Sequence, residues 1–585
     1  MATATSQRVR TVAQPPIARA RRWTMPTVIA VLALFLRLWA PGPVSQTQDE
    51  FSWLQNSDAF RSGVMHGDFQ RATGGQTMPG VTTLWSGTLG YASVSVAHEV
   101  GLVSKAPVAF SPTVLRVSRA FVALWCSIAL GLFVAIAALL VGRRAAAIAG
   151  VLLATEPFLV GHSDVLHTDA MVTMFGALSA IALLAGLRAV RLTAPAEHGT
   201  DPASTTPIAS RGAQIPLVVL SGAAGGLAVL TKLNAVPLVL GAAAVVMTVE
   251  VLAARRNAAG AIFGWWRFAL RDNARLVAIW AVSALAIVVV LWPALWVAPR
   301  EQLRLIRYSL DQLDRGQGLT FFRERLTPDA GVTYYPVALV LRMTPWFLIG
   351  AVFATLGVVS RFIWGCFRRA QRASPRNNVA ATLLLASAPY ALVITFTSQK
   401  YDRYSLPLFP FLAIACGVLL AEAVDHLGKR VRSTQWVLPA GALVAMLLTL
   451  STLSHAPFAI SYVDPLAGGQ SRAHRTILLG WGEGLEVLGA EIRRREGEHC
   501  DDARVLAPFL YIVAFPCGRL VNSAPTRGVR GLDYYVRYVK DEQRALSNDK
   551  ALYNSVRRAG RLVKAVRIGG LNYAELWKIG RHTRP

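Results

Sequence analysis

Two aspartates and two histidines fall within one short stretch of the chain, PFLVGHSDVLHTDAMVTMF, which separates two apolar runs. These residues are His162, Asp164, His167 and Asp169. Ionisable side chains at a membrane boundary are costly unless they are paired or hydrated, so the stretch is a candidate functional site. We expect a bent loop that enters a helix near Thr168, with Thr168 as the N-cap. The alternative is a hydrated loop whose aspartates only cap a helix.

Three further sets of ionisable residues lie at the ends of apolar runs that we place on the same side of the membrane. These are Asp49 with Glu50, Lys232, and Lys400 with Arg403. A carboxylate can accept a proton from an attacking hydroxyl, whereas lysine and arginine hold a phosphate and stabilise its charge as it leaves. Acids and bases on one membrane face therefore suit a reaction on a phosphate-bearing lipid. Singly, each set is also explained by a hydrated loop, a lysine reaching the interface or an interfacial anchor.

The composition indicates that most of the chain faces lipid. The chain has 585 residues, of which 54% are hydrophobic and 16% are charged, and its mean hydropathy is +0.42. These values are typical of many membrane-spanning helices, each of roughly 20 apolar residues. A formal charge of +27 is compatible with nucleic-acid binding. The basic residues, however, lie mostly in short loops between apolar runs, so we expect a lipid bilayer as the partner and no nucleic acid.

The apolar runs predict a mainly α-helical, polytopic membrane protein of about eleven spans. We expect the spans at residues 25–40, 119–141, 145–161, 170–190, 215–231, 235–254, 276–298, 336–360, 378–396, 404–425 and 436–457. The arginine-rich loops predict a cytoplasmic N-terminus in the plasma membrane, with residues 1–24 as a disordered basic tail. They leave two long outer loops, 41–118 and 299–335, with interfacial helices near 81–103 and 303–313. Loop 191–214 is expected to be flexible.

Residues 461–585 are richer in charge than the transmembrane domain, 25–460, that precedes them. Short apolar runs alternate there with helix-like stretches such as GEGLEVLGAEIRRR, which predicts a small extracytoplasmic α/β domain. Cys500 and Cys517 lie in this domain and can pair if the compartment is oxidising. The other three cysteines lie in or beside apolar runs and are expected to be packing residues: Cys126, Cys366 and Cys416.

Several motifs, in their order along nearly the whole chain, resemble those of polyprenyl-phosphate-dependent membrane glycosyltransferases of the GT-C type. The chain looks most similar to the branch that holds the protein O-mannosyltransferases and the bacterial lipid A aminoarabinose transferases. The matching stretches are Asp49-Glu50-Phe51, Thr168-Asp169, GLAVLTK ending at Lys232, TPDAGVTYYPVALVLRMTP from Thr327 to Pro345, KYDRYSLPLFP from Lys400 to Pro410, and GWGEGL from Gly480 to Leu485. A His-Pro or Lys-Pro pair frequent in the family is replaced here by Thr77-Met78-Pro79.

The resemblance implies a GT-C-like fold and the transfer of a sugar from a polyprenyl-phosphate donor to a hydroxyl of a protein, lipid or glycan acceptor. The implied reaction is a single displacement with inversion at the outer membrane face. Asp49 is the implied general base, Glu50 a second candidate, and Asp169 the residue that orients the acceptor or the partners of Asp49. The implied substrate contacts are Asp164, Lys232, Lys400, Arg403 and Tyr404.

A transporter or flippase of lipid-linked sugars is the alternative from another class. It would use the same cavity and basic residues without breaking a bond, and matching broken helices in two halves would favour it. The sequence contains no repeat of that kind, and a structural scaffold would leave the outer charges unexplained. His162, His167 and the nearby acids are compatible with a divalent metal, but no ligand spacing is diagnostic, so we expect no cofactor.

Overall fold

In the computed structural model of the chain, the described residues are 16–39, 45–70, 72, 79–108, 110–189, 214–257, 265–314, 319–367, 374–431, 435–507, 512–515, 517–521, 529, 531–544 and 547–579. The predictions made for the tail before residue 16 and for the flexible loop between residues 190 and 213 lie outside these ranges. The same holds for Thr77 and Met78.

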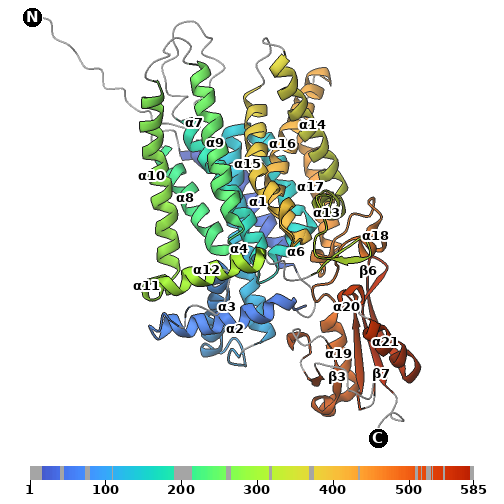
Figure 1. The fold of residues 1–585 in the computed structure, drawn as a ribbon. Helices are drawn as coiled ribbons and strands as arrows, with labels where there is room; N and C mark the ends of the chain where they lie inside the picture. Colours follow the sequence, from blue (N-terminus) through green and yellow to red (C-terminus); the bar gives the residue numbers. More distant parts are fainter. Residues whose placement is uncertain are drawn as a thin grey trace, which may run out of the picture.

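Helices dominate the described residues and form one elongated body (Figure 1). The helices of this body are α1 (Pro16–Leu38), α4 (Pro112–Val141), α5 (Arg143–Thr155), α6 (Pro157–Ser163), α7 (Asp169–Ala189), α8 (Gln214–Thr231), α9 (Ala235–Asn257), α10 (Trp265–Leu291), α14 (Pro345–Phe367), α15 (Pro375–Phe396), α16 (Phe409–Val431) and α17 (Val437–Leu453). Within the described residues, seven helices are long and apolar enough to cross a membrane, and the bent α5–α6 pair adds an eighth.

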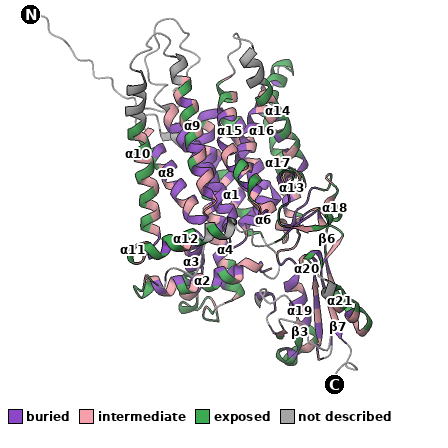
Figure 2. Ribbon diagram, in the orientation of Figure 1, coloured by how far each residue is buried: buried purple, intermediate pink, exposed green. Residues whose placement is uncertain are grey.

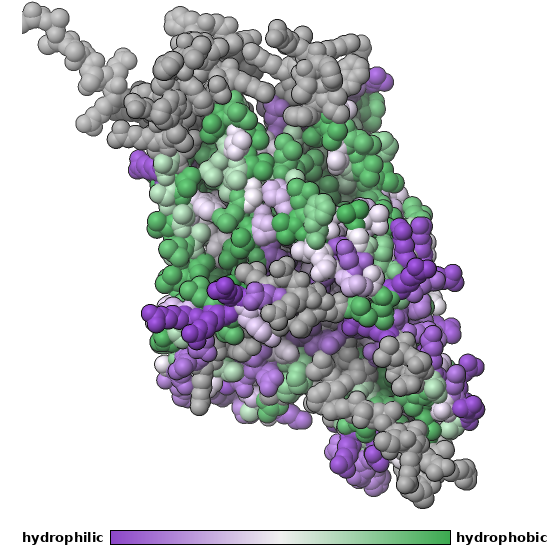
Figure 3. Space-filling view, in the orientation of Figure 1, coloured by the Kyte–Doolittle hydropathy of each residue, from purple (hydrophilic) through white to green (hydrophobic). Residues whose placement is uncertain are grey.

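The polytopic helical prediction is confirmed, because each predicted span coincides with a helix or a helix pair. α14 and α17 contain shorter apolar segments than the seven helices, and α1 covers the first predicted span. Apolar side chains cover the helical body, and hydrophilic ones gather at the end that carries the C-terminal domain (Figure 3). The surface thus has the distribution expected of a body immersed in lipid and an end immersed in water.

Two predicted spans are broken by proline. The span expected at 145–161 bends by 63° between α5 and α6, where Pro157 begins the second helix. The span expected at 336–360 starts as a separate helix, α13 (Tyr334–Arg342), which ends before Pro345. Proline has no amide hydrogen, and its ring clashes with the preceding turn, so it disfavours the continuation of a helix and is tolerated in the first turn.

A buried glutamate joins the two proline breaks. Glu156, between α5 and α6, accepts hydrogen bonds from the backbone nitrogen of Thr344 at 2.9 Å and from its hydroxyl at 2.8 Å. Because Thr344 directly precedes α14, the carboxylate satisfies an amide that this helix leaves free. The joint fixes α6, and with it the loop to α7, against α14.

The two loops expected outside fold into short elements at the end of the body that also carries the C-terminal domain (Figure 1). They are α2 (Gln48–Met65), α3 (Val81–Glu99), α11 (Ala294–Val297), α12 (Pro299–Asp314), and the antiparallel hairpin β1 (Thr320–Phe322) with β2 (Arg325–Thr327). α3 and α12 coincide with the two predicted interfacial helices, and neither is among the helices able to span. The hairpin was not predicted from the sequence.

Residues after α17 form the predicted α/β domain. Its helices are α18 (Gly469–Thr476), α19 (Leu485–Glu496), α20 (Val539–Arg544) and α21 (Ser547–Ala559). Its sheet has the order β4-β3-β5-β7-β6, in which β3 pairs in parallel with both neighbours and β7 pairs antiparallel with both of its own. The strands are β3 (Arg504–Leu506), β4 (Arg519–Val521), β5 (Tyr534–Tyr538), β6 (Gly560–Ile568) and β7 (Leu571–Ile579).

The cysteines follow their predictions where the structure describes them. Cys500 and Cys517 form a disulfide with their Cα atoms 5.6 Å apart. Cys126 and Cys416 are buried free thiols, whereas the side chain of Cys366 lies outside the described part of the chain. The disulfide closes a loop that contains β3 and ends just before β4, at the edge of the C-terminal sheet.

The core of the helical body surrounds α7. Nearly every side chain of this helix is buried, whereas the outlying α10 presents intermediate and exposed residues (Figure 2). α7 packs against α4, α8 and α9, so its first residue, Asp169, is held from several directions. A rigid, buried helix start is a suitable place for a group whose position must be exact to within a fraction of an ångström.

Candidate active site

A histidine connects the two carboxylates to which the sequence assigned chemistry. Asp49 lies in the first turn of α2, Asp169 begins α7, and His167 lies in the loop before α7. His167 Nε2 is 3.3 Å from Asp49 Oδ2, and His167 Nδ1 is 3.0 Å from Asp169 Oδ2. The loop bends as expected and α7 starts after Thr168, whose carbonyl accepts from the amide of Val172.

Two of the predicted basic residues belong to the same cluster. Lys232 Nζ is 2.7 Å from Asp169 Oδ1, and Arg403 Nε is 3.1 Å from Asp169 Oδ2. Arg403 Nη2 also lies 3.7 Å from Asp49 Oδ2. The Asp169 side chain is 3% exposed and is shared by these cations, whereas the Asp49 side chain is 38% exposed. Asp49 thus retains an open face toward a ligand.

Aromatic rings hold the cations of this cluster. The Arg403 guanidinium lies 4.2 Å from the ring centre of Tyr401 and 4.5 Å from that of Trp481, which belongs to the chain after α17. Lys232 Nζ lies 4.3 Å from the ring centre of Tyr404. Desolvated cations gain from such ring faces. Tyr404, a predicted substrate contact, therefore supports Lys232 in this structure.

The cluster sets the charges of Asp49 and His167. Burial alone would raise the pKa of Asp49, but the hydrogen bond and charge of His167, together with Arg403, lower it to about 2. Burial would lower the pKa of His167, but Asp169 and Asp49 raise it above its usual value. Asp49 is consequently a carboxylate at neutral pH, and His167 keeps its proton to a higher pH than a free histidine.

A polar cavity of about 170 Å³ lies beside Asp49. Asp49 and Arg403 line it, whereas Asp169 and Lys232 lie behind them. The cavity is also lined by Gln48, Phe158, His162, Tyr334, Arg342, Tyr401, Asp402, Ile460, Leu478, Gly480, Trp481, Glu483, Lys540 and Arg544. The helical body and the C-terminal domain both contribute, so the cavity lies between them.

Several residues of this cavity were not predicted from the sequence. Arg342 is one of them, and its guanidinium pairs with Asp402 at 2.7 Å. Lys540 and Arg544 are two more, contributed by α20. The conspicuous motif GWGEGL contains Trp481 and Glu483, but a stretch of ordinary composition holds the α20 residues. No local signal in the sequence distinguishes them from surface charges.

Glu50 takes a different position from the one predicted for a second catalytic carboxylate. Its side chain is 0% exposed and pairs with Arg119 at 2.6 Å. Its oxygens also accept from the backbone nitrogens of Thr47 and Leu166, each at 2.7 Å. It does not line the polar cavity. In this structure the buried carboxylate stabilises the start of α2, and the role of Glu50 as a second catalytic candidate stays a prediction.

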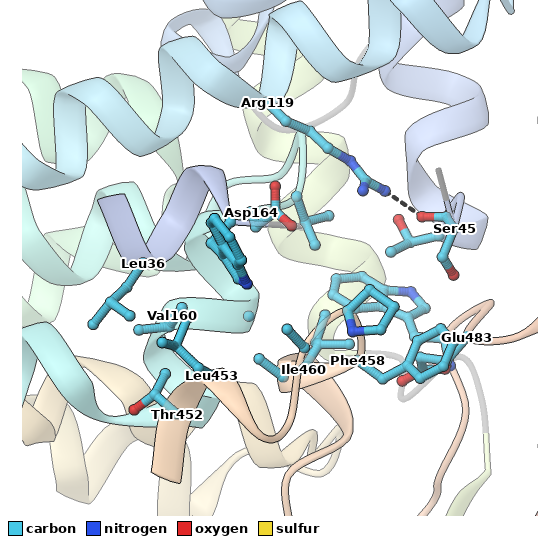
Figure 4. Close-up of a pocket in the computed structure, with 18 residues that line it drawn as sticks. Leu36, Ser45, Arg119, Val160, Asp164, Thr452, Leu453, Phe458, Ile460 and Glu483 are labelled. Atoms are coloured by element: carbon cyan, nitrogen blue, oxygen red, sulfur yellow. Dashed lines mark hydrogen bonds between the residues drawn. The ribbon is translucent and has the colours of Figure 1, made fainter. Parts of the chain in front are cut away.

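Asp164 lies in a second, smaller pocket (Figure 4). In that view the Asp164 carboxylate and Arg119 lie near one another, and Arg119 donates to the carbonyl of Ser45. The pocket measures about 40 Å³ and shares Trp481 and Glu483 with the polar cavity. Asp164 is therefore separate from the Asp49 cluster, and only a substrate in this pocket would touch it. The preference for Asp169 as the second carboxylate of the cluster agrees with this geometry.

Lys400 is not among the residues that meet at Asp49, contrary to the prediction of a phosphate contact. Its side chain is 1% exposed, and its ammonium donates to the carbonyls of Thr395 and Thr397. A third contact, at 3.1 Å, is with Asp329. An ammonium has three donors, and these contacts occupy all of them. In this structure Lys400 therefore caps the end of α15, and its contact with a substrate phosphate stays a prediction.

The expectation that the site needs no metal ion stays a prediction. Among the residues that the structure describes, there is no group of three or more His, Cys, Asp or Glu side chains arranged to hold a metal ion. His167 is already placed between Asp49 and Asp169, with one ring nitrogen toward each.

No protein-family model matches the chain, and no curated protein matches its sequence. A structure of ArnT from Cupriavidus metallidurans bound to undecaprenyl phosphate aligns over 96% of this chain and 98% of its own, with 15% identity and a TM-score of 0.46. The oligosaccharyltransferase AglB from Archaeoglobus fulgidus, in complex with an inhibitory peptide and a dolichol-phosphate, aligns over 98% of this chain and 75% of its own. Its identity is 12% and its TM-score 0.45. Similarity at this level determines neither activity nor substrate.

Proposed function

We propose that this membrane protein is a glycosyltransferase that moves a sugar from a polyprenyl-phosphate donor to an acceptor hydroxyl. The observation that carries the proposal is the open Asp49 carboxylate, which lines a polar cavity beside Arg403 and is held from behind by His167. The motif resemblance supports the donor class. A carboxylate next to an arginine at a membrane face matches an attack by a hydroxyl that displaces a phosphate.

The proposed reaction is one displacement with inversion. The acceptor oxygen attacks the anomeric carbon, and the bond from that carbon to the phosphate oxygen breaks with its electron pair left on the phosphate. The acceptor proton passes to Asp49. Because its pKa is about 2, Asp49 is a weak base, so proton transfer comes late, when the attacking oxygen has already lost electron density to carbon.

The other residues of the cluster are proposed to position these groups. His167 and Arg403 fix the orientation of the Asp49 carboxylate, and Asp169 fixes both of them. Lys232 balances the charge of Asp169 at 2.7 Å. Arg403 lies between two aromatic rings and faces the cavity. It is the residue of the helical body that we propose as a contact for the donor phosphate.

The test is a transfer assay with the purified full-length protein and a panel of polyprenyl-phosphate sugars. We expect acceptor-dependent release of polyprenyl phosphate from one of them, and much slower release by an Asp49→Asn variant. A flippase has no bond to break, so movement of an intact lipid-linked sugar across vesicles without release would contradict the proposal.

We further propose that the end of the body carrying α2 and the C-terminal domain faces the outside. An engineered cysteine at the exposed Gln70 is then expected to react with an impermeant reagent from outside, whereas one at the exposed Lys429 is not. Cys126 and Cys416 are buried, and Cys500 and Cys517 are disulfide-bonded, so these four cysteines contribute little background. Labelling of the Lys429→Cys variant alone would show that the opposite end of the body faces the outside.

A further inference from the structure

The charges that the helical body presents to the polar cavity are already compensated. Asp169 pairs with Lys232, and Arg403 lies between Asp169 and Asp49. Arg342 pairs with Asp402. The cations of this half therefore neutralise the protein's own carboxylates, and beyond the contact proposed for Arg403 little of their charge is left for an anionic ligand.

The C-terminal domain adds two cations that make no ion pair of this kind within the described residues. Lys540 and Arg544, one helical turn apart on α20, both line the cavity. Among the described residues, neither lies within salt-bridge distance of a carboxylate, whereas their neighbour Arg537 pairs with Glu542 at 2.6 Å. Lys540 donates a hydrogen bond to the neutral side chain of Gln48, the residue before Asp49. Two positive charges thus face the cavity beside the proposed base.

Hydrogen bonds hold α20 in this position. Gln543 accepts from the backbone nitrogen of Leu479 at 2.7 Å and donates to the carbonyls of His474 and Ile477. Tyr538, just before α20, donates to Glu483 at 2.7 Å. The segment before α2 is attached to the same domain, because Gln46 accepts from the amide of Val513. The two cations are therefore fixed relative to Asp49 and are not carried by a free surface helix.

We propose that Lys540 and Arg544 form a site for a phosphate monoester dianion, the leaving group of the transfer reaction; the inference rests on the proposed function. In the donor, the phosphate is a diester with one negative charge. When the bond from the anomeric carbon to the phosphate oxygen breaks, the electron pair stays on that oxygen, and the product is a monoester that carries nearly two charges at neutral pH.

The second charge develops in the transition state, and uncompensated cations act most strongly on it. An interaction that grows as the bond breaks raises the rate more than it tightens donor binding. The cations of the helical body are thus paired, whereas Lys540 and Arg544 have no ion-pair partner among the described residues. The body holds the base, and the C-terminal domain receives the leaving group.

The test measures binding of two probes that differ by one charge. These are a polyprenyl monophosphate and its methyl ester, at pH 7.5 and fixed ionic strength, with the full-length protein in detergent. We expect the wild type to bind the monophosphate about tenfold tighter than the ester, as expected for added charge-assisted hydrogen bonds. The Lys540→Ala/Arg544→Ala double variant is expected to lose this preference while its affinity for the ester changes little.

A matched control removes two charges elsewhere in the same domain. Arg557 and Arg558 are exposed on α21 and do not line the cavity, so the Arg557→Ala/Arg558→Ala variant is expected to keep the wild-type preference. An α20 double variant that keeps the preference, or that loses affinity for both probes equally, would overturn the inference while leaving the proposed transfer reaction intact. Failure of the wild type to bind either probe would overturn the donor class itself, and the inference with it.

Discussion

Asp49 and Glu50 are adjacent residues of one helical turn, yet they belong to two different regions of the molecule. Asp49 opens onto the polar cavity and is 38% exposed, with His167 and Arg403 at one side of its carboxylate. Glu50 is 0% exposed, and Arg119 and two backbone amides occupy its oxygens. Successive helical residues point about 100° apart, so one carboxylate meets the cavity and the other meets α4.

The difference shows what separates a structural carboxylate from a chemical one. Both have a strong cationic partner, so the presence of an ion pair does not distinguish them. The distinction is whether lone pairs are left over and whether a ligand can reach them. Glu50 has neither, whereas Asp49 has both. The same criterion separates Lys400, whose three donors are used, from Lys540, which faces the cavity.

The largest expected effect is the loss of turnover when Asp49, the carboxylate open to the cavity, is replaced. Asp49→Asn keeps the size of the side chain and removes the proton acceptor, so turnover in the transfer assay should fall by roughly 10²–10⁴-fold. Donor binding is expected to change little, because the carboxylate acts as a proton acceptor only when the bond to the phosphate breaks. Normal transfer by the variant would show that the open carboxylate is not the base.

For Glu50, the buried carboxylate, the expected effect of a substitution is on stability. Glu50→Gln leaves Arg119 buried without its counter-charge, and breaking a buried pair in this way costs about 3–5 kcal/mol. The free energy of unfolding, or the Tm in detergent, should therefore drop sharply, while the folded fraction keeps its turnover number. A variant with unchanged Tm and lost turnover would place Glu50 with the catalytic groups instead.

A smaller stability effect is expected at Lys400. Lys400→Met preserves the length of the side chain but leaves the carbonyls of Thr395 and Thr397 without their donor, at a cost of about 1–3 kcal/mol. Because its ammonium is fully used, the KM for the donor should stay unchanged. A raised KM at unchanged Tm would restore the phosphate contact that the sequence predicted.

The smallest effect concerns pH. Burial, with help from Arg544, lowers the pKa of Lys540 to about 8, so its charge and its help to the leaving group are lost as the pH rises through that value. We expect kcat to decline above pH 8 in the wild type and to stay level in Lys540→Arg, whose side chain remains charged. Asp49, with a pKa of about 2, should add no decline between pH 4 and 7.

The decline of kcat at alkaline pH can be distinguished from unfolding, because the titration of Lys540 changes the free energy of unfolding in the opposite direction. The folded-state pKa of Lys540 is below that of the unfolded chain, so the unfolded state binds more protons between the two values. Its titration therefore increases the free energy of unfolding as the pH rises through this window. A loss of activity that follows a falling Tm in the same pH range would exclude Lys540 as its cause.

The amino-acid sequence determined the helical membrane body and the α/β character of the C-terminal domain. Both follow from local composition, because span length and apolar periodicity are properties of neighbouring residues. It also identified Asp49, Asp169, Lys232 and Arg403, which lie in conspicuous motifs and meet at one site. The broken spans were less accessible, although Pro157 and Pro345 mark the positions at which they break.

Only the tertiary structure decided which charged residues face the cavity. Glu50 and Lys400 have the right residue type beside the right motif, but partners distant in sequence, Arg119 and Asp329, occupy them. Lys540 and Arg544 stand in an ordinary stretch, and Gln543 brings them to the cavity by hydrogen bonds to residues more than sixty positions away. These long-range contacts decide whether a charged side chain pairs with another residue or faces a ligand, and no local sequence pattern encodes them.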